Sequence, residues 1–177
     1  MLFISLLSSP SWSVTIGDLV KRDGLYYEKF TDAPFTGEVT GVYQGSIKNG
    51  NEEGAWVGYY ESGELWNKGN FKNGGREGAW VSYHKNGQLE SKGNYKNGKE
   101  DGAWIRHWEN GQLKRKENYS NGKREGAWLG YWINGQLGLK GNYKIGKKEG
   151  AWVSYNKDGT VNKGNTGTFK DGVKISD

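Results

Sequence analysis

Two histidines and a periodic set of carboxylates are the residues of this chain whose types could support catalysis or metal binding. Imidazole serves as a general base or a metal ligand, and grouped carboxylates can hold a cation. The histidines, His84 and His107, occupy different positions of a repeating pattern, and the strand register predicted below places them on opposite faces of a sheet. A metal or proton relay shared between them is therefore not expected.

The carboxylates precede each copy of the tripeptide Gly-Ala-Trp. They are Glu53, Glu77, Asp101, Glu125 and Glu149. The predicted register places a basic residue (Lys48, Lys72, Lys96 or Lys144) opposite each of them except Glu125, which faces Ser120. Solvated pairs worth a few tenths of a kcal/mol are favoured over cation binding. The sequence also lacks cysteine, a P-loop and a nucleophile elbow. We therefore expect no catalytic residue, no metal site, no cofactor and no enzymatic activity.

A row of lysines recurs with the same period: Lys68, Lys92, Lys116 and Lys140. This row could contact the phosphates of anionic lipid headgroups. The alternative is a row of charges that keeps a flat sheet soluble and blocks association of its edges. Because the formal net charge is only +5 and arginine-rich patches are missing, nucleic acid is not an expected partner.

The elements that must position these residues follow from a repeat of 24 residues. Gly-Ala-Trp begins at Gly54, Gly78, Gly102, Gly126 and Gly150. Each unit contains two Asn-Gly turn signals or their equivalents, as at Asn86-Gly87 and Asn97-Gly98, between short aromatic and β-branched runs. The 30 glycines exclude helices. The prediction is an all-β fold, an elongated single-layer antiparallel β-meander of tandem 24-residue β-hairpin repeats.

The turns predict the strand register. A two-residue loop at Asn86-Gly87 pairs His84 with Leu89 and Trp80 with Gly93. A four-residue loop over 97–100 pairs Tyr95 with Gly102. On this register one face carries tryptophans that alternate with glycines, and a second row on the same face alternates aromatic residues with leucines. A ring that covers the bare backbone of a glycine explains how so glycine-rich a chain folds. No segment is left over to cover this face.

The aromatic residues divide into a structural set and a set of candidate contacts. We expect the structural row to be Trp56, Trp80, Trp104, Trp128 and Trp152. Residues that vary in identity between repeats are better placed to contact a partner, and Trp66 is an off-pattern aromatic predicted on the opposite face. The candidates for partner binding are Tyr60, Trp66, Trp108 and Trp132.

The ends of the chain depart from the pattern. An apolar run followed by small residues predicts a signal segment over 1–13, and hence a periplasmic or secreted protein, with a cytoplasmic protein as the alternative. Residues 14–50 are expected to form an N-terminal cap with a degenerate repeat. The regular array is predicted over 51–164, and a C-terminal cap over 165–177.

The recurring Gly-Ala-Trp-x-x-Tyr, Asn-Gly-Gln-Leu and Lys-Gly-Asn-Tyr-Lys-Asn-Gly-Lys segments resemble the MORN repeat, and more closely its bacterial variant. The resemblance covers about residues 24–172. It implies protein–protein contact, dimerisation or phospholipid binding, and bacterial members are catalogued as YwqK-type antitoxins. The chain departs from the family pattern at Glu117 in place of Gly, His107 in place of Tyr and Ile145 in place of Asn.

The sequence thus favours a noncatalytic module that binds a protein partner, of which an antitoxin or immunity role is a special case with a toxin as the partner. The alternative is a membrane-surface or cell-envelope module that contacts anionic phospholipid through the lysine row. Self-association through the sheet edges is also compatible with the pattern.

Overall fold

The computed structural model describes residues 13–177, so the predicted signal segment lies almost entirely outside the described residues. The N-terminal part contains β1 (Val14–Thr15), the 3-10 turn η1 (Ile16–Asp18), β2 (Leu19–Arg22), β3 (Leu25–Glu28), β4 (Gly37–Thr40) and β5 (Tyr43–Lys48). Within residues 13–177 no helix is long and apolar enough to span a membrane.

The repeat array forms the rest of the molecule. Its strands are β6 (Asn51–Tyr59), β7 (Leu65–Lys72), β8 (Gly75–Tyr83), β9 (Leu89–Lys96), β10 (Lys99–His107), β11 (Leu113–Ser120), β12 (Lys123–Arg124), β13 (Gly126–Tyr131), β14 (Leu137–Lys144) and β15 (Lys147–Ser154). The chain ends with η2 (Lys163–Asn165), β16 (Gly167–Lys170) and β17 (Val173–Ser176).

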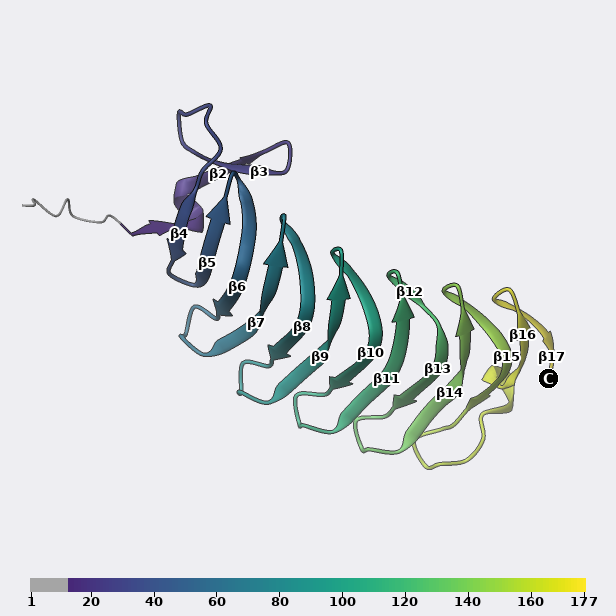
Figure 1. Cartoon of the computed structure of the whole chain (residues 1–177). Coiled ribbons are helices and arrows are strands. Elements are labelled where there is room, and N and C mark those ends of the chain that lie inside the picture. The colour runs from purple at the N-terminus through teal and green to yellow at the C-terminus, as the bar shows by residue number, and fades with distance from the viewer. Residues whose placement is uncertain (1–12) are drawn as a thin grey trace, which may run out of the picture.

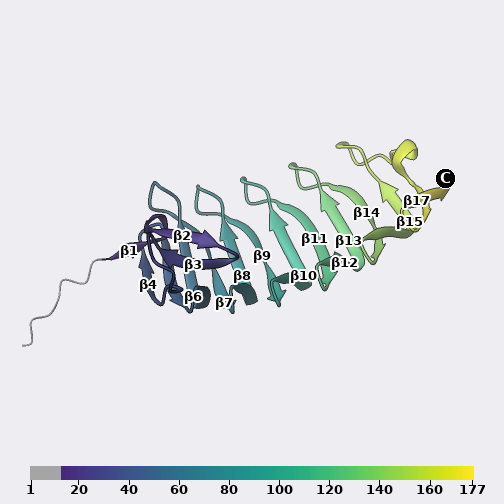
Figure 2. The ribbon, with the colours of Figure 1, turned by 90° about the horizontal axis from the view of Figure 1, so that it is seen from above.

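The strands form one sheet of 15 strands, plus a separate two-stranded sheet made by β2 and β3. Within residues 13–177, consecutive strands from β4 to β17 pair antiparallel, except that β12 and β13 both pair with β11, and only β1 pairs in parallel, with β4. Figure 1 shows the hairpins following one another as a curved ribbon, and Figure 2 shows the same succession from above. The predicted all-β meander of tandem hairpin repeats is confirmed.

Both Asn-Gly turns differ in loop length from the prediction, and the shorter loop is at Asn97-Gly98 and not at Asn86-Gly87. Asn97 and Gly98 both have positive φ, +51° and +74°, which defines a two-residue type I′ turn closed by the pair Lys96↔Lys99. At the other turn only Gly87 has positive φ, and His84 N donates to Gln88 O at 2.8 Å. This geometry is a three-residue loop in which a type I turn is followed by a left-handed glycine.

The true turn types shift the register next to each turn. Tyr95 faces Glu100 and not Gly102, because Gly102 lies in a bulge with φ of +70°. Beyond the bulge the predicted register returns, and Ile105 pairs with Lys92. At the other end of the hairpin Tyr83, not His84, pairs with Leu89. The leucines therefore share a face with the Tyr83 column, and the predicted row of alternating aromatics and leucines is wrong.

The pairing of tryptophan with glycine across the strands is as predicted, with Trp80 opposite Gly93 and Trp128 opposite Gly141. We call the face that carries these tryptophans the aromatic face. Trp104 lies so close over Gly93, on the neighbouring strand, that a Cβ there would overlap its ring. Tyr95 packs edge-on against Trp104 at 5.1 Å between ring centroids. Only Gly leaves room for this arrangement, which buries four of the five tryptophans to 6% exposure or less: Trp56, Trp80, Trp104 and Trp152.

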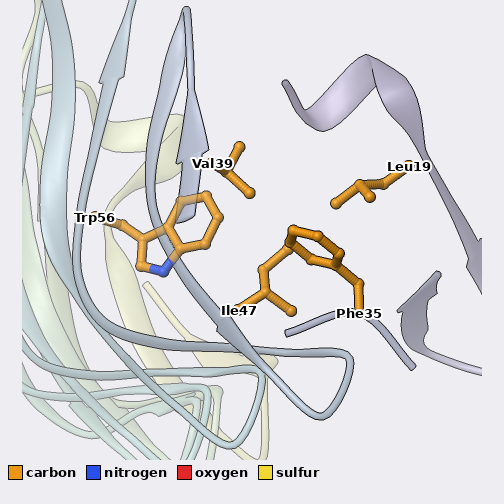
Figure 3. Packing of buried hydrophobic residues seen from close by; sticks show 5 residues of the cluster. All are labelled: Leu19, Phe35, Val39, Ile47 and Trp56. Atoms are coloured by element: carbon orange, nitrogen blue, oxygen red, sulfur yellow. The ribbon is translucent and has the colours of Figure 1, made fainter. Parts of the chain in front are cut away.

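The N-terminal segment covers the first hairpins, whereas the sequence analysis expected an N-terminal cap but no segment over the aromatic face. Phe35, Leu19 and Val39 pack with Ile47 and Trp56 into a small core (Figure 3). This core closes the N-terminal end of the aromatic face. Across β8 to β15 no second layer covers the sheet, as far as residues 13–177 show (Figures 1 and 2).

Candidate binding site

Three of the four candidate contact residues join one repeat to the next. Trp108 Nε1 donates to Tyr131 O at 3.2 Å, and Trp132 Nε1 donates to Tyr155 O at 3.0 Å. The hydroxyl of Tyr60 makes the equivalent bond. All three side chains are partly exposed. They have a structural role, and each ring is held in place by a bond to the backbone 23 residues further on.

Trp66, the fourth candidate, lies on the aromatic face and not on the opposite one. It packs edge-on against Tyr43 at 6.0 Å and tilts against Tyr60 at 6.2 Å. The reason is a bulge: Gly58 pairs with Asn67 and Tyr59 with Leu65, which leaves Trp66 as the extra residue. Trp66 lines a hollow of about 220 Å³ beside the N-terminal core.

The acidic column does not pair with lysines across the strands. Glu77 Oε2 accepts a hydrogen bond from Asn97 N at 2.8 Å, and Glu125 Oε2 accepts one from Ile145 N at 2.7 Å. Each carboxylate thus binds the first backbone N–H of the type I′ turn, or of its equivalent, in the next hairpin. The predicted loop pairs are wrong, because the predicted register was two residues off beside that turn.

The four lysines lie on the face opposite the tryptophans, where Lys92 is flanked by Val81 and Ile105. All four are exposed: Lys68, Lys92, Lys116 and Lys140. Because they occupy every second strand, neighbouring lysines are spaced by about 10 Å. We call this surface the lysine face.

The histidines are adjacent, with His84 Nε2 3.1 Å from His107 O. The bond goes to the backbone of His107 and not to its ring. Burial lowers the pKa of His107, and the charges of Lys92 and His84 lower it further. In the described part of the chain no group of three or more His, Cys, Asp or Glu residues could hold a metal ion.

A buried carboxylate surrounded by arginines interrupts the regular pattern. Glu117 is 2% exposed and occupies a strand position that the other units fill with glycine. Its Oε1 lies 2.9 Å from Nε of both Arg106 and Arg115, and its Oε2 lies 3.3 Å from Arg124 Nε. Burial alone would raise the pKa of Glu117. The hydrogen bond from Arg106 and the charges of the arginines outweigh it and hold the pKa below its ordinary value.

Glu117 also displaces the neighbouring tryptophan. In the other units the indole lies on the preceding glycine. In three of them it donates to a backbone carbonyl, as Trp104 does to Asn94 O at 3.2 Å, whereas Trp56 Nε1 has no hydrogen-bond partner within residues 13–177. Trp128 instead leans over Gly130 and donates to Glu117 Oε2 at 3.3 Å. Trp128 is therefore only partly buried, whereas the other four tryptophans of the structural row are buried.

The displaced indole forms one wall of a hollow on the aromatic face, with a volume of about 330 Å³. Trp108 and Trp132 supply the other two indoles, and Tyr131, whose backbone O accepts the hydrogen bond from Trp108, also borders the hollow. The other lining residues are Lys114, Arg115, Gly130, Gly138, Leu139 and Ser154. Two of the four candidate residues, Trp108 and Trp132, are thus brought together here, whereas Tyr60 and Trp66 lie two hairpins away.

Sequence reasoning missed the charged residues of this face. Arg76 lies 4.3 Å over the Trp80 ring, and Lys148 lies 4.6 Å over Trp152. The sequence did not predict their positions, because the incorrect loop length at Asn97-Gly98 placed glycines opposite Tyr95 and its equivalents. Glu117 departs from a column that is otherwise glycine, and this departure is the feature of the sequence that could have indicated the site.

Comparison with known proteins identifies the repeats. The MORN repeat variant model matches residues 52–73, 76–97 and 100–121. The array therefore contains three tandem MORN repeats, a kind of repeat generally associated with binding modules. Nothing matched in a search of curated proteins. Among solved structures, the crystal structure of a GtfA/B complex bound to UDP and GlcNAc aligns with 76% of this chain and 24% of that chain, at 16% identity and a TM-score of 0.25.

Proposed function

We propose that this chain is a noncatalytic module that binds a protein partner through the aromatic face around the hollow. The observation that carries the proposal is the partly exposed indole cluster of Trp108, Trp128 and Trp132. The equivalent central tryptophans of the other units are buried, so the partial exposure of Trp128 is specific to this place in the array.

The indoles are held before any partner arrives. Each of the three N–H groups is bonded within the protein, to Tyr131 O, to Tyr155 O or to Glu117. Rings held in this way lose little conformational entropy on binding, which favours affinity. Tryptophan and arginine are also the side chains that most often dominate protein interfaces.

Affinity capture with the full chain tests the proposal. We expect one partner to be enriched from native extract and to be lost when Trp108→Ala and Trp132→Ala are combined. Both substitutions remove a bond between repeats, so circular dichroism must first show that the variant remains folded. Lys92→Gln with Lys116→Gln, on the lysine face, serves as the control and should retain the partner. A folded double tryptophan variant that still binds the partner would refute the proposal.

Toxin neutralisation is a special case that draws support from the resemblance to bacterial MORN variants alone. It requires that the captured partner arrest growth when expressed by itself. Co-expression of this chain should restore growth, and the Trp108→Ala, Trp132→Ala variant should not. A captured partner without toxicity would remove the antitoxin interpretation and leave the binding module in place.

The lysine face supports a second candidate function, a module that contacts anionic phospholipid at a membrane or envelope surface. Exposed lysines near an anionic surface each contribute about 1 kcal/mol to membrane binding. Vesicles with 30% phosphatidylserine should then bind the chain at low salt, and vesicles of phosphatidylcholine should not. Replacing all four lysines with glutamine should abolish binding. If binding is indifferent to anionic lipid and to salt, the candidate function fails.

A further inference from the structure

We infer that the hollow binds a protein segment in which a large apolar side chain, best an aromatic one, stands beside one or more carboxylates. This inference rests on the proposed function and names the chemistry of the partner. Three features of the hollow support it. They are its volume, the positive charge around it and its lack of free neutral hydrogen-bond donors.

The space arises at two glycines whose positions carry long side chains in the preceding unit. Gly130 occupies the position of Arg106 in the preceding unit, and Gly138 occupies that of Lys114. A Cβ on Gly130 would overlap the Trp128 ring, and a Cβ on Gly138 would lie 3.0 Å from Trp132 Nε1. The volume of about 330 Å³ is enough for one large side chain and part of its backbone.

The charge around the hollow is positive. Lys114 Nζ lies 4.2 Å from the centre of the Trp108 ring, and Lys157 Nζ lies 5.7 Å from that of Trp132. Arg115 is a third cation at the lining, and none of the described lining residues is acidic. Cations beside an apolar hollow favour a ligand that carries both a ring and a negative charge.

Arg115 retains donors for such a ligand. Its Nε is 2.9 Å from Glu117 Oε1, but the N–H does not point at that oxygen, and within residues 13–177 Arg115 Nε has no hydrogen-bond partner. Glu117 takes its hydrogen bonds from Arg106, Arg124 and Trp128. The Nε of Arg115 is buried, but its side chain is 30% exposed, and within residues 13–177 no hydrogen bond engages its two Nη groups, which are the donors left for a carboxylate.

The absence of free neutral donors argues for a peptide over a sugar. A hydroxyl-rich ligand needs neutral donors and acceptors at close range, but the indole N–H groups are already bonded to protein oxygens. Ser154 and Tyr131 are the neutral polar side chains among the described lining residues. What the hollow offers is apolar surface with guanidinium and ammonium groups beside it, which matches an apolar side chain next to Asp or Glu.

The test uses the full chain and the blocked peptide Gly-Phe-Asp-Asp-Gly as the probe. The indole ¹⁵N–H resonances of Trp108, Trp128 and Trp132 should shift on titration, and the resonances of the buried Trp80 and Trp104 should not. Gly-Phe-Asn-Asn-Gly and Gly-Ala-Asp-Asp-Gly should each bind at least tenfold more weakly. That factor corresponds to about 1.4 kcal/mol.

Three variants assign the binding to the hollow. Arg115→Gln should weaken the peptide roughly tenfold, whereas Lys92→Gln makes the same charge change on the other face and should have no effect. Gly138→Lys and Gly138→Glu introduce the residues that earlier units carry at this position, Lys114 and Glu90, so the fold should tolerate them. Both should abolish binding, because each fills the hollow.

The outcomes distinguish a failure of the inferred ligand chemistry from a failure of the proposed protein-binding function. Loss of the captured partner on Gly138→Lys, with no binding of any acidic peptide, would keep the proposed function and refute the acidic segment. Binding of the peptide that survives Gly138→Lys would place its site elsewhere and refute the hollow. A glucuronic acid disaccharide that shifts the same indoles when the peptide does not would also refute the inference.

Discussion

Glu117 illustrates how one residue changes the chemistry of a repeat. Its neighbours on the aromatic face are three arginines, each between one fifth and two fifths exposed, and its own carboxylate is inaccessible to solvent. A buried charge of this kind is costly unless it is paired and hydrogen-bonded. The arginines pair with this charge. Because the Glu117 side chain occupies the place of a glycine, Trp128 is displaced and the hollow forms.

Removing the charge of Glu117 should destabilise the protein. Glu117→Gln leaves three arginines facing a neutral amide, and we expect a loss of about 2 kcal/mol in the free energy of unfolding, reduced from the value for fully buried pairs because the arginines are partly solvated. Urea unfolding followed by circular dichroism measures the effect. Glu100→Gln, beside the same Arg106 but more exposed, is the control and should cost less.

The depressed pKa of Glu117 also fixes the direction of the acid response. The unfolded chain binds a proton near the ordinary pKa of 4.5 and the folded chain binds it at lower pH, so this stabilisation is present above pH 4.5. It is lost as the pH falls through the folded pKa. The stability of Glu117→Gln should therefore decline less than that of the unsubstituted protein below pH 4.5, and equal slopes would contradict the assignment.

His107 should make stability depend on pH in a higher range. Its pKa is lowered in the folded state, so between the folded value and the ordinary 6.5 the unfolded chain binds more protons and stability falls as the pH is lowered from 6.5. His107→Tyr restores the residue found at Tyr59, Tyr83 and Tyr131 and should flatten this slope. Denaturant midpoints at pH 7.5 and 5.5 provide the comparison, and an unchanged slope would show that His107 does not titrate as inferred.

At the scale of the element, the two turns of each hairpin show which features the sequence could predict. The 24-residue period, the Trp–Gly pairs and the face of the lysines followed from spacing alone. The turn types did not, because Asn86-Gly87 and Asn97-Gly98 are the same dipeptide, and the bulges beside the true turns leave the predicted register in the middle of the strands unchanged. Residues near the turns were therefore misplaced, among them the acidic column and Leu89.

Ile145 replaces Asn at the first position of a type I′ turn and should weaken it. Its φ is +50°, a left-handed conformation that costs L-residues about 1–2 kcal/mol and that Asn adopts more readily. Ile145→Asn should stabilise the protein by about 1 kcal/mol, because the Ile side chain is 63% exposed and loses little burial. The melting temperature tests this. The reverse change in the preceding unit, Asn121→Ile, should destabilise it.

At the scale of the whole molecule, each hairpin is bonded to the next in the same way. The acidic column binds 20 residues ahead, and the Trp108 and Asn86 side chains bind carbonyls 23 residues ahead. In the described chain the most extensive contacts between strands join neighbours in the sheet. Stability in such an array is approximately the sum of local terms, so damage at one end should stay local.

Phe35→Ala tests this locality at the N-terminal core. Removing a buried phenylalanine should cost about 3–5 kcal/mol locally. Hydrogen exchange should accelerate in β4 to β6, where Val39, Ile47 and Trp56 lose a neighbour. Amides in β13 to β15 should keep their protection. Uniform acceleration across all strands would show that the array unfolds as a single cooperative unit.

Because each hairpin makes the same bonds to the next one, whole units can be added to or removed from the array. A duplicated unit placed between two ordinary neighbours would meet the same donors, acceptors and ring surfaces, so the gene can gain or lose 24 codons without a new interface having to evolve. The stretch from Arg106 to Gly138 is the exception, because Glu117 and the arginines around it come from successive hairpins. A recombination event inside this stretch would leave Glu117 buried without its arginines, so duplication or deletion there should cost stability.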